Sequence, residues 1–519
     1  MTQTFIQNQV VIQPGNISLD QLRLLAFDTT TISIDPSCRT NIRVSAATVT
    51  RAADSHAAVY GVNTGFGKLA STRIAHDDLA LLQLRLLRSH AVGVGDPLAN
   101  KVVRLILALK ASSLARGYSG VREVVIDTLI ALYNHNIMPI IPAQGSVGAS
   151  GDLAPLAHLS LALIGEGEVF YKGQRIAATV ALEKAKITPI VLSAKEGLAL
   201  INGTQVSTAL AIDALIATDT LFEAAVIAGA LSLDAARGSD GPFDERIHVV
   251  RGQPGQIDCA AAYRALAQGS AIRASHLVGD DRVQDPYCLR CQPQVMGACL
   301  DQMRYAAQVL VREANAVTDN PLVFGDDMVS GGNFHAEPVA LAADALAVVI
   351  AEIGAIAERR IAMLVDPAVS RLPAFLTPDA GLNSGFMIVH VTAAALASEN
   401  KSLAHPASVD SLPTSANQED HVSMATFAAR RLGPMLANSG RIIAIECLAA
   451  AQGIEFIRPL KSSVALEGVL ALIRDKSEAM MQDRSLSTDI EAIYQMQAQG
   501  LIGLSIEGVI PQLLTLRLQ

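Results

Sequence analysis

The run Gly148-Ala149-Ser150-Gly151-Asp152 places a serine between two small residues. Because glycine has no Cβ, the backbone nitrogen of Gly151 can approach the carbonyl carbon of Ala149 without a clash. Attack on that carbonyl with loss of one water, followed by loss of a second water from Ser150, would give a methylidene-imidazolone ring. This ring is an electron-poor alkene, which no ordinary side chain supplies. An isolated five-residue match is weak, however, and on its own favours a Gly/Ser turn before a helix.

The sequence around this run favours the cofactor-forming interpretation over a plain turn. The run extends to GSVGASGDLAPLAH (145–158), and further motifs follow or precede it along almost the whole chain. They resemble the signature of the histidine and phenylalanine ammonia-lyase family, in which this tripeptide becomes the methylidene-imidazolone cofactor and no external cofactor is used. The other motifs are YGVNTGFGKLASTR (60–73), NGTQ (202–205), PYCLRCQPQ (286–294), TDNPL (318–322), GGNFHAEP (331–338) and NQEDHVSM (417–424).

Three positions resemble the histidine branch of that family: Ser89, His90 and the Glu419 of NQED. The tyrosine lyases tend to show His-Leu at the first pair and the phenylalanine lyases Phe-Leu, and both usually lack the glutamate. The resemblance therefore implies conversion of L-histidine to trans-urocanate and ammonia, the first step of histidine degradation.

One stretch departs from the histidine branch. Residues 386–391 read FMIVHV, where FMIPQV is usual, so that Val389 and His390 replace a proline and a glutamine. If His390 lines the pocket, its imidazole favours a modified histidine or another polar amino acid as substrate. If His390 lies on a helix outside the pocket, it alters packing only, and the sequence leaves both interpretations open.

Two tyrosines are implied as catalytic groups by the resemblance. The β-carbon proton of histidine is weakly acidic, so a base needs an electrophile that makes the amine a good leaving group. Tyr60 is the implied base for this proton, and Tyr287 the second tyrosine, which handles the amine proton. A tyrosine pKa near about 10 must be lowered by neighbouring charges or dipoles for this task.

The remaining site residues implied by the resemblance bind the substrate. Arg290 offers a planar bidentate donor for the amino acid carboxylate, and Asn202 and Gln284 add neutral hydrogen bonds. Each such side chain, taken singly, is more often an ordinary core or surface group, and only the shared motifs single it out. Three further contacts are implied: Glu419, also catalytic, at the imidazole or amino group, His90 at the imidazole end, and Phe334 against the cofactor.

Two patterns imitate metal sites. Cys288-x-x-Cys291 has no second such pair at zinc spacing and lies inside the Tyr-x-x-Arg motif. His335-Ala336-Glu337 lacks a clear third ligand. We interpret both as structural and predict no metal in the site.

Helices and the loops between them must position these residues. The segment 60–73 has three glycines and an asparagine, which give too much backbone freedom for a helix interior, so we expect an ordered loop there. Apolar residues recur at helical spacing in 78–90, 101–134, 294–364 and 384–447, and a short strand over 9–12 precedes a helix start at Ser18. The pattern predicts an all-α fold, an elongated bundle of long helices with a smaller N-terminal domain that carries the cofactor loops. The predicted regions are 1–200 for that domain, 201–460 for the central bundle and 461–519 for a helical cap.

Composition limits the class of protein further. Half of the residues are hydrophobic but only 4% are aromatic, so burial must depend on Ala, Leu, Ile and Val, which suits packed helices. The net charge of −9 argues against nucleic acid as a partner. The apolar stretch 339–357 contains Asp344 and Glu352, and we interpret it as a core helix, not a membrane span. Sparse cysteines and a polar start without a signal peptide favour the cytoplasm.

The resemblance also implies a homotetramer whose active sites take residues from more than one chain, which would explain why Tyr60, Ser150, Arg290 and Glu419 are far apart in the sequence. An alternative is a lyase or aminomutase of the same family that acts on a modified histidine or another amino acid. A second alternative, from another class, is a non-catalytic scaffold. Such a relative would be expected to lose Ser150 or the tyrosines, and this chain retains them.

Overall fold

The computed structural model describes the chain except for residues 1–8, 28, 56, 507, 511–514 and 517–519. Helices account for 59% of it and strands for 8%, which confirms the predicted helical class. The chain divides into two compact units, each built from three stretches. Because these stretches alternate along the sequence, the units do not coincide with the predicted regions 1–200, 201–460 and 461–519. The first unit comprises Met1–Asp213, Ala307–Asp344 and Pro406–Arg430, and the second Ala214–Ala306, Ala345–His405 and Arg431–Gln519.

The described part of the first unit opens with two strands, β1 (Gln9–Ile12) and β2 (Thr31–Ile34), which pair in parallel. Helix α1 (Leu19–Leu25) connects them along the chain. Ser18 begins α1 with a capping box, in which its hydroxyl accepts from the Gln21 amide and the Gln21 side chain accepts from the Ser18 amide. This reciprocal pair satisfies two amides that the first helical turn leaves free. The strand and the helix start predicted from the sequence are therefore confirmed.

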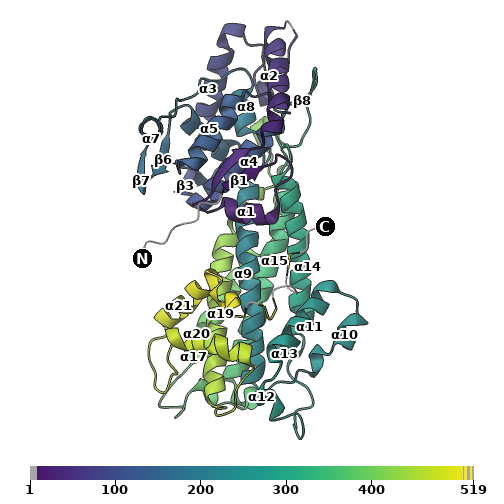
Figure 1. Cartoon of the computed structure of the whole chain (residues 1–519), viewed down its shortest axis with the longest axis vertical. Coiled ribbons are helices and arrows are strands. Elements are labelled where there is room, and N and C mark those ends of the chain that lie inside the picture. The colour runs from purple at the N-terminus through teal and green to yellow at the C-terminus, as the bar shows by residue number, and fades with distance from the viewer. Residues whose placement is uncertain (1–8, 28, 56, 507, 511–514, 517–519) are drawn as a thin grey trace. The chain divides into compact units, whose positions relative to one another are not determined.

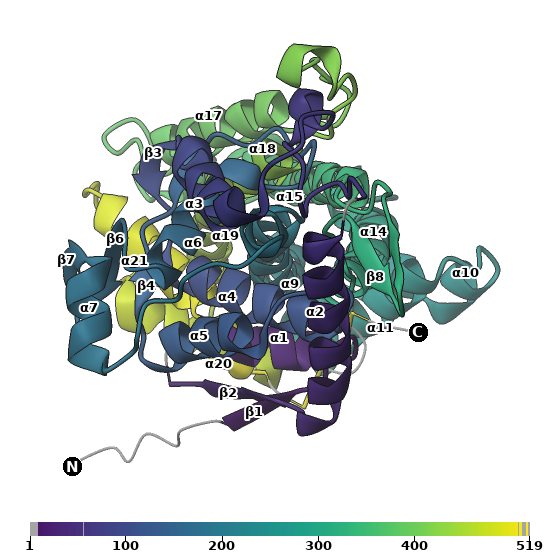
Figure 2. The same cartoon turned by 90° about the horizontal axis from the view of Figure 1, so that it is seen from above.

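Two groups of helices form the body of the first unit. Helix α3 (Leu79–His90) packs against α6 (Leu153–Leu163) and α8 (Glu196–Ile201), while α4 (Asn100–Ala115) packs against α5 (Glu123–Asn134), as Figure 2 shows for the latter pair. Helix α4 is buried along nearly its whole length. The unit also contains α2 (Arg39–Asp54), α7 (Ala178–Ala185), α18 (Ala425–Arg430) and small antiparallel sheets of β3 (Val94–Pro97) with β5 (Pro142–Gln144), of β4 (Met138–Pro139), β6 (Glu168–Tyr171) and β7 (Gln174–Ala177), and of β8 (Leu322–Phe324) with β9 (Asp327–Val329).

Helix α19 (Leu432–Glu455) is the centre of one group of helices in the second unit. It packs against α17 (Met387–Leu403), α20 (Val464–Lys476) and α21 (Ser487–Ala498), coloured green to yellow in Figure 1. Its run of buried alanines and glycines allows this close packing. The unit also contains α10 (Glu245–Val249), α11 (Pro254–Ala267), α12 (Ala271–Ala274), α13 (Tyr287–Arg290), α16 (Pro367–Ser370) and α22 (Leu501–Leu504). Three of its boundaries with the first unit fall within the long helices α9 (Gln205–Ala235), α14 (Gln292–Ala314) and α15 (Glu337–Val365).

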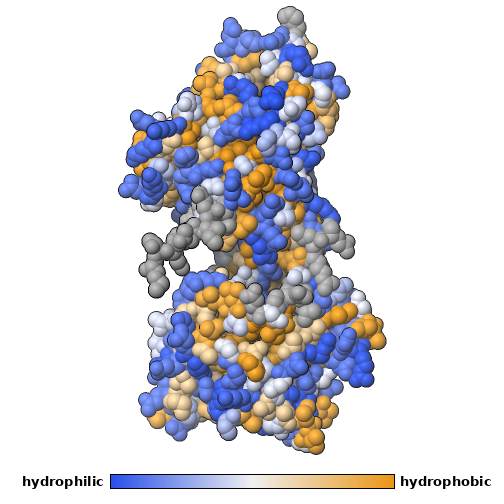
Figure 3. Space-filling view, in the orientation of Figure 1, coloured by the Kyte–Doolittle hydropathy of each residue, from blue (hydrophilic) through white to orange (hydrophobic). Residues whose placement is uncertain are grey.

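Helices α9 and α15 are long and apolar enough to cross a membrane, but their most apolar windows are 72% and 67% buried inside the protein. Core helices of soluble proteins pass the same test of length and composition. Figure 3 shows hydrophilic side chains distributed over the visible face, with hydrophobic ones between them. The burial of α15 agrees with the prediction that 339–357 forms a core helix.

Candidate active site

The tripeptide lies where the backbone of another segment leaves no room for a side chain. Gly151 has a φ of +73°, and a Cβ added to it would lie 2.1 Å from the Gly203 carbonyl oxygen. The two glycines form an isolated parallel bridge, and the Asp152 amide donates to the Gly203 carbonyl at 2.8 Å. The Asn202 side-chain amide donates to the Ser150 carbonyl at 2.8 Å. The turn at residues 202–203 therefore holds the tripeptide from one side.

Asp152 fixes the same turn from its other end. The carboxylate is fully buried and accepts from the amides of Val206 and Ser207, at 3.0 and 2.8 Å, and from the Ser207 hydroxyl at 3.0 Å. Its other oxygen accepts from the hydroxyls of Ser146, at 3.0 Å, and Thr426, at 2.6 Å. Because these donors come from the residues before the tripeptide, from the first turn of α9 and from α18, Asp152 ties three segments together.

Lys110, on helix α4, also contacts the turn at residues 202–203. Its ammonium is fully buried and donates to the Asn202 carbonyl at 2.7 Å, with the Gln205 side-chain oxygen at 3.4 Å. Burial lowers the pKa of Lys110 to about 7, although the Asp319 carboxylate opposes the shift. Asp319 also pairs with the buried Lys195 at 3.2 Å. Lys110 could not be identified from the sequence, because nothing local distinguishes it from a surface lysine of an amphipathic helix.

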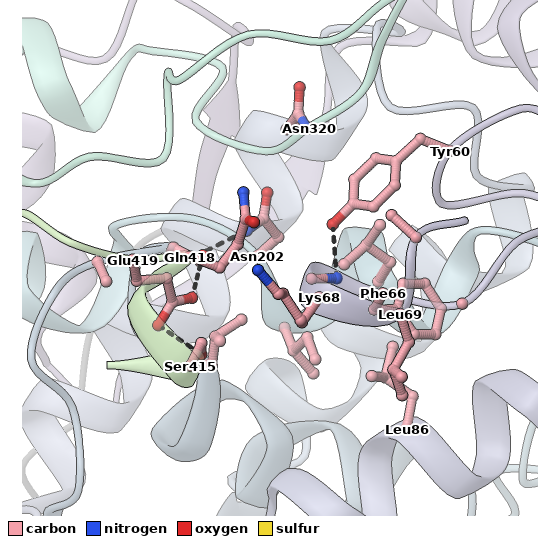
Figure 4. Close-up of a pocket in the computed structure, with 18 of the residues that line it drawn as sticks. Tyr60, Phe66, Lys68, Leu69, Leu86, Asn202, Asn320, Ser415, Gln418 and Glu419 are labelled. Atoms are coloured by element: carbon pink, nitrogen blue, oxygen red, sulfur yellow. Dashed lines mark hydrogen bonds between the residues drawn. The ribbon is translucent and has the colours of Figure 1, made fainter. Parts of the chain in front are cut away.

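Glu419 contacts the tripeptide directly. One carboxylate oxygen accepts from the Ser150 hydroxyl at 2.7 Å, and the other accepts from the hydroxyls of Thr414, at 2.7 Å, and Ser415, at 2.9 Å. Figure 4 shows the hydrogen bond between Ser415 and Glu419. Burial would raise the pKa of the Glu419 carboxyl, but the hydrogen bonds from Thr414, Ser150 and Ser415 outweigh it and hold that pKa below its usual value. Glu419 is therefore an ionised acceptor at neutral pH.

His90 is the last residue of helix α3. Its Nδ1 lies 2.9 Å from the Leu86 carbonyl and 3.0 Å from the Ser89 hydroxyl. Burial lowers the pKa of His90, while the Leu86 carbonyl and Glu419 oppose the shift. Because a carbonyl can only accept, the neutral ring carries its proton on Nδ1 and leaves Nε2 as an acceptor.

Tyr60 begins the loop 60–73, which was predicted to be ordered and not helical. The loop consists of turns and one short 3-10 turn, Gly67–Leu69, and the Gly67 amide lies 3.5 Å from the Tyr60 hydroxyl (Figure 4). The hydroxyl thus faces the turn that also carries Phe66 and Lys68. The prediction of an ordered loop is confirmed.

Tyr60, His90, Ser150, Asn202 and Glu419 line one cavity of about 1050 Å³. All of its lining residues belong to the first unit, and its volume suits a small-molecule ligand. The lining also contains Lys68, Arg85, Asn320 and Gln418, which the sequence analysis did not single out, although three of them lie within the motifs quoted above. The predicted site residues in the lining are Tyr60, His90, Ala149, Ser150, Asn202, Phe334 and Glu419.

Of the other four predicted site residues, Gly151 belongs to the first unit and three belong to the second unit. A separate cavity of about 470 Å³ is lined by Gln284, which precedes α13, and by Tyr287 and Arg290, which lie on α13. The Tyr287 ring is 71% exposed, and the Arg290 guanidinium carbon lies 4.8 Å from its centroid. The Arg290 Nε is buried without a hydrogen-bond partner among the described residues. These groups retain free hydrogen-bonding capacity.

His390 lies on helix α17 in the second unit and does not line the cavity that contains Ser150. Its Nε2 is 2.8 Å from a carboxylate oxygen of Glu358 on α15. Burial would raise the pKa of Glu358, but hydrogen bonds from Arg359 and His390 hold it below its usual value. Within this unit His390 thus serves as a packing and hydrogen-bonding residue. Val389 lies on the same helix and lines a cavity near Arg441.

The two metal-like patterns behave differently in the structure. Cys288 and Cys291 are free thiols and belong to no metal-like cluster among the described residues. His335 and Glu337, in contrast, lie beside His421, and the potential ligand atoms of all three are within 4.8 Å of one another. The third ligand that the sequence did not reveal is thus supplied by a segment far along the chain.

The sequence is similar to known proteins over almost its whole length. The sequence model described as aromatic amino acid lyase matches residues 17–475. A histidine ammonia-lyase of Aromatoleum aromaticum is 60% identical over 493 residues, which cover 95% of this chain and 94% of that protein.

Two solved structures have similar folds. The histidine ammonia-lyase of Trypanosoma cruzi has a TM-score of 0.90 at 40% identity and covers 98% of both chains. The tyrosine aminomutase of Streptomyces globisporus has a TM-score of 0.90 at 34% identity and covers 96% of this chain and 98% of its own. Lyases and aminomutases of different substrates therefore share this fold.

Replacement of Asp152 by alanine tests the anchoring of the turn. Asp152→Ala leaves the buried amides of Val206 and Ser207 without an acceptor, and each such group costs about 1–3 kcal/mol. We expect the free energy of unfolding, measured by urea titration with circular dichroism, to fall by at least about 2 kcal/mol. The control Asp20→Ala removes a carboxylate that is 96% exposed and should change it by less than about 0.5 kcal/mol. Equal stability of the two variants would contradict the anchoring role.

Proposed function

Because the chain belongs to the aromatic amino acid lyase family, we propose that it is an ammonia-lyase that converts L-histidine to trans-urocanate and ammonia. The observation that carries the substrate assignment is the 60% identity to a histidine ammonia-lyase over almost the whole chain. The contact between Glu419 and Ser150 supports it, because it puts an ionised carboxylate beside the reacting centre.

The residues around the tripeptide fit a methylidene-imidazolone formed from Ala149, Ser150 and Gly151. No Cβ can be accommodated at Gly151, so the only residue type whose nitrogen could take part in ring closure occupies that position. The Asn202 amide holds the Ser150 carbonyl, which remains an oxygen acceptor of the ring system. When formed, such a ring supplies an electrophile that makes the substrate amine a better leaving group.

Loss of the Ser150 hydroxyl as water has a consequence for Glu419. That hydroxyl is the donor to one Glu419 oxygen at 2.7 Å, whereas Thr414 and Ser415 hold the other oxygen. After dehydration the first oxygen is left without this donor and is available to a substrate N–H. Glu419 is then fixed by two hydroxyls and still ionised, which suits recognition of the ammonium or imidazole N–H groups.

The remaining roles follow the same proposal. Tyr60 removes the β-carbon proton, and neutral His90, whose Nε2 is an acceptor, meets the N–H of the substrate imidazole. Phe334 packs at the cofactor.

Three roles fall to residues of the second unit. Arg290, with its unpartnered Nε, binds the substrate carboxylate in bidentate fashion. Tyr287 handles the amine proton, and Gln284 adds a neutral hydrogen bond. No metal is required for this chemistry.

We further propose a cytoplasmic homotetramer whose active sites combine residues of more than one chain. Two features support it: Ser150 and Glu419 line one cavity, while Tyr287 and Arg290 line another and are exposed or unpartnered. All six cysteines are free thiols, as expected in a reducing compartment.

The second candidate is a lyase or aminomutase of the same family that acts on a modified histidine or another amino acid. The 34% identity to a tyrosine aminomutase of the same fold favours keeping it. The pairing of His390 with Glu358 weakens it, because this substitution then changes packing inside the second unit instead of the cavity at Ser150.

Product formation from separate amino acids tests the proposal. We expect near-ultraviolet absorbance of urocanate with L-histidine and no acrylate product with tyrosine or phenylalanine. Ser150→Ala should reduce this turnover at least about 10³-fold, as expected when covalent catalysis is lost. The control Ser160→Ala removes a hydroxyl of α6 that donates to the Leu156 carbonyl within the same helix, and should retain activity. Turnover of another amino acid instead, or a β-amino acid product, would refute the histidine assignment.

Mixed assemblies test the sharing of active sites between chains. Ser150→Ala and Tyr287→Phe should each be nearly inactive, but tetramers purified with one tag on each variant should regain activity, because some sites combine an intact Ser150 with an intact Tyr287. The control mixture of Ser150→Ala with Glu419→Gln should stay inactive, because both residues line one cavity of a single chain. Failure of the first mixture, or equal recovery in the control, would contradict shared sites.

A further inference from the structure

His335, Glu337 and His421 form a cluster at the cavity that contains Ser150. Glu337 is the first residue of helix α15, His335 lies two residues before it, and His421 lies in the segment that carries Glu419. Both histidines line the cavity. The potential ligand atoms of the three side chains lie within 4.8 Å of one another.

Glu337 has an oxygen that needs a cationic partner. Its Oε2 is shielded from solvent and has no hydrogen-bond partner among the described residues. A carboxylate oxygen that has lost its water without gaining a donor or a cation costs free energy. A positive charge placed between Glu337 and the two imidazoles would remove that cost.

The two imidazoles are arranged so that each can offer a lone pair. The His335 Nε2 lies 3.1 Å from the His421 backbone carbonyl, so in the neutral ring this nitrogen carries the proton and Nδ1 keeps the lone pair that can bind a cation. The rings stack with centroids 5.7 Å apart and planes at 8°. Since His421 is exposed, rotation of its side chain can turn its ring nitrogen toward Nδ1 of His335.

The ligand types indicate which ion would bind. Two imidazoles and one carboxylate suit a borderline ion such as Zn²⁺, whereas Mg²⁺ and Ca²⁺ prefer oxygen ligands alone. Bonds of about 2.0–2.1 Å in a tetrahedral site require the ligand atoms to draw closer than they lie now. The exposed His421 is the side chain free to move.

We propose that His335, Glu337 and His421 form a Zn²⁺-binding site with three protein ligands and a fourth position for water. Such an ion would join the N-terminus of α15 to the segment that carries Glu419 and the positive-φ residues Ser415, Ala416 and Asn417. It takes no part in the elimination chemistry. The site is a candidate point of control, because bound Zn²⁺ would restrict the segment that positions Glu419.

Zn²⁺ titration calorimetry of the chelator-treated full-length protein tests the site without any substrate, so its outcome does not depend on the proposed lyase activity. We expect one Zn²⁺ per chain. His421→Ala and the isosteric Glu337→Gln should each weaken binding at least about tenfold, the loss that even outer partners of metal ligands cause. The matched control His135→Ala removes an exposed histidine outside the cluster and should bind as the unchanged protein does.

Three results would overturn the proposal. They are absence of Zn²⁺ binding, binding that survives both cluster substitutions, and binding that is lost in Cys288→Ser, which would assign the ion to the Cys288 and Cys291 thiols. A rise of the melting temperature with Zn²⁺ in the unchanged protein, absent in His421→Ala, would support it independently.

Discussion

The close approach of the Gly203 backbone to Gly151 is the constraint on which the site depends. With a Cβ at residue 151 only 2.1 Å from the Gly203 oxygen, neither backbone can move apart or accept a side chain without breaking the bridge between them. Gly203 itself has a φ of +132°, and a Cβ there would lie 2.5 Å from the Gln205 side-chain oxygen. Glycine is needed at 151 because the Gly203 backbone occupies the position of a Cβ, and at 203 because the positive φ is rarely adopted by other residues.

Buried ionisable groups maintain this contact. Lys110 and Asp152 lie in a part of the first unit where neither can be hydrated, and such groups are tolerated only when hydrogen bonds replace water. Lys110 donates to the Asn202 carbonyl, and Asp152 accepts from the amides of Val206 and Ser207. The two groups thus act on opposite ends of the same turn. The stability of the unit and the geometry of the tripeptide are coupled through residues 202–207.

The local elements could be predicted from the sequence because their signals are local. The Ser18 capping box, the strand at 9–12 and the irregular loop after Tyr60 each depend on neighbours within a few residues. The motifs also identified Ser150, Asn202 and Glu419, which the structure brings into one cavity. The resemblance supplied their roles, and these stay predictions.

The long-range contacts could not be predicted in the same way. Lys110 reaches Asn202, His421 reaches His335, and His390 reaches Glu358 across segments with no pattern that links them. The division into two compact units has the same origin, because residues 307–344 and 406–430 join the first unit only through tertiary packing. Patterns of residue type describe a helix face but not its partner.

The proposed chemistry depends on the covalent state of the tripeptide. Mass spectrometry of the peptide that contains Ala149, Ser150 and Gly151, released by proteolysis of the purified protein, measures this state directly. Ring closure and loss of the Ser150 hydroxyl predict a peptide lighter than its sequence by two waters, and a peptide of full mass in Gly151→Ala. A full-mass peptide in the unchanged, active protein would show that the packing of Gly151 against Gly203 serves only the fold.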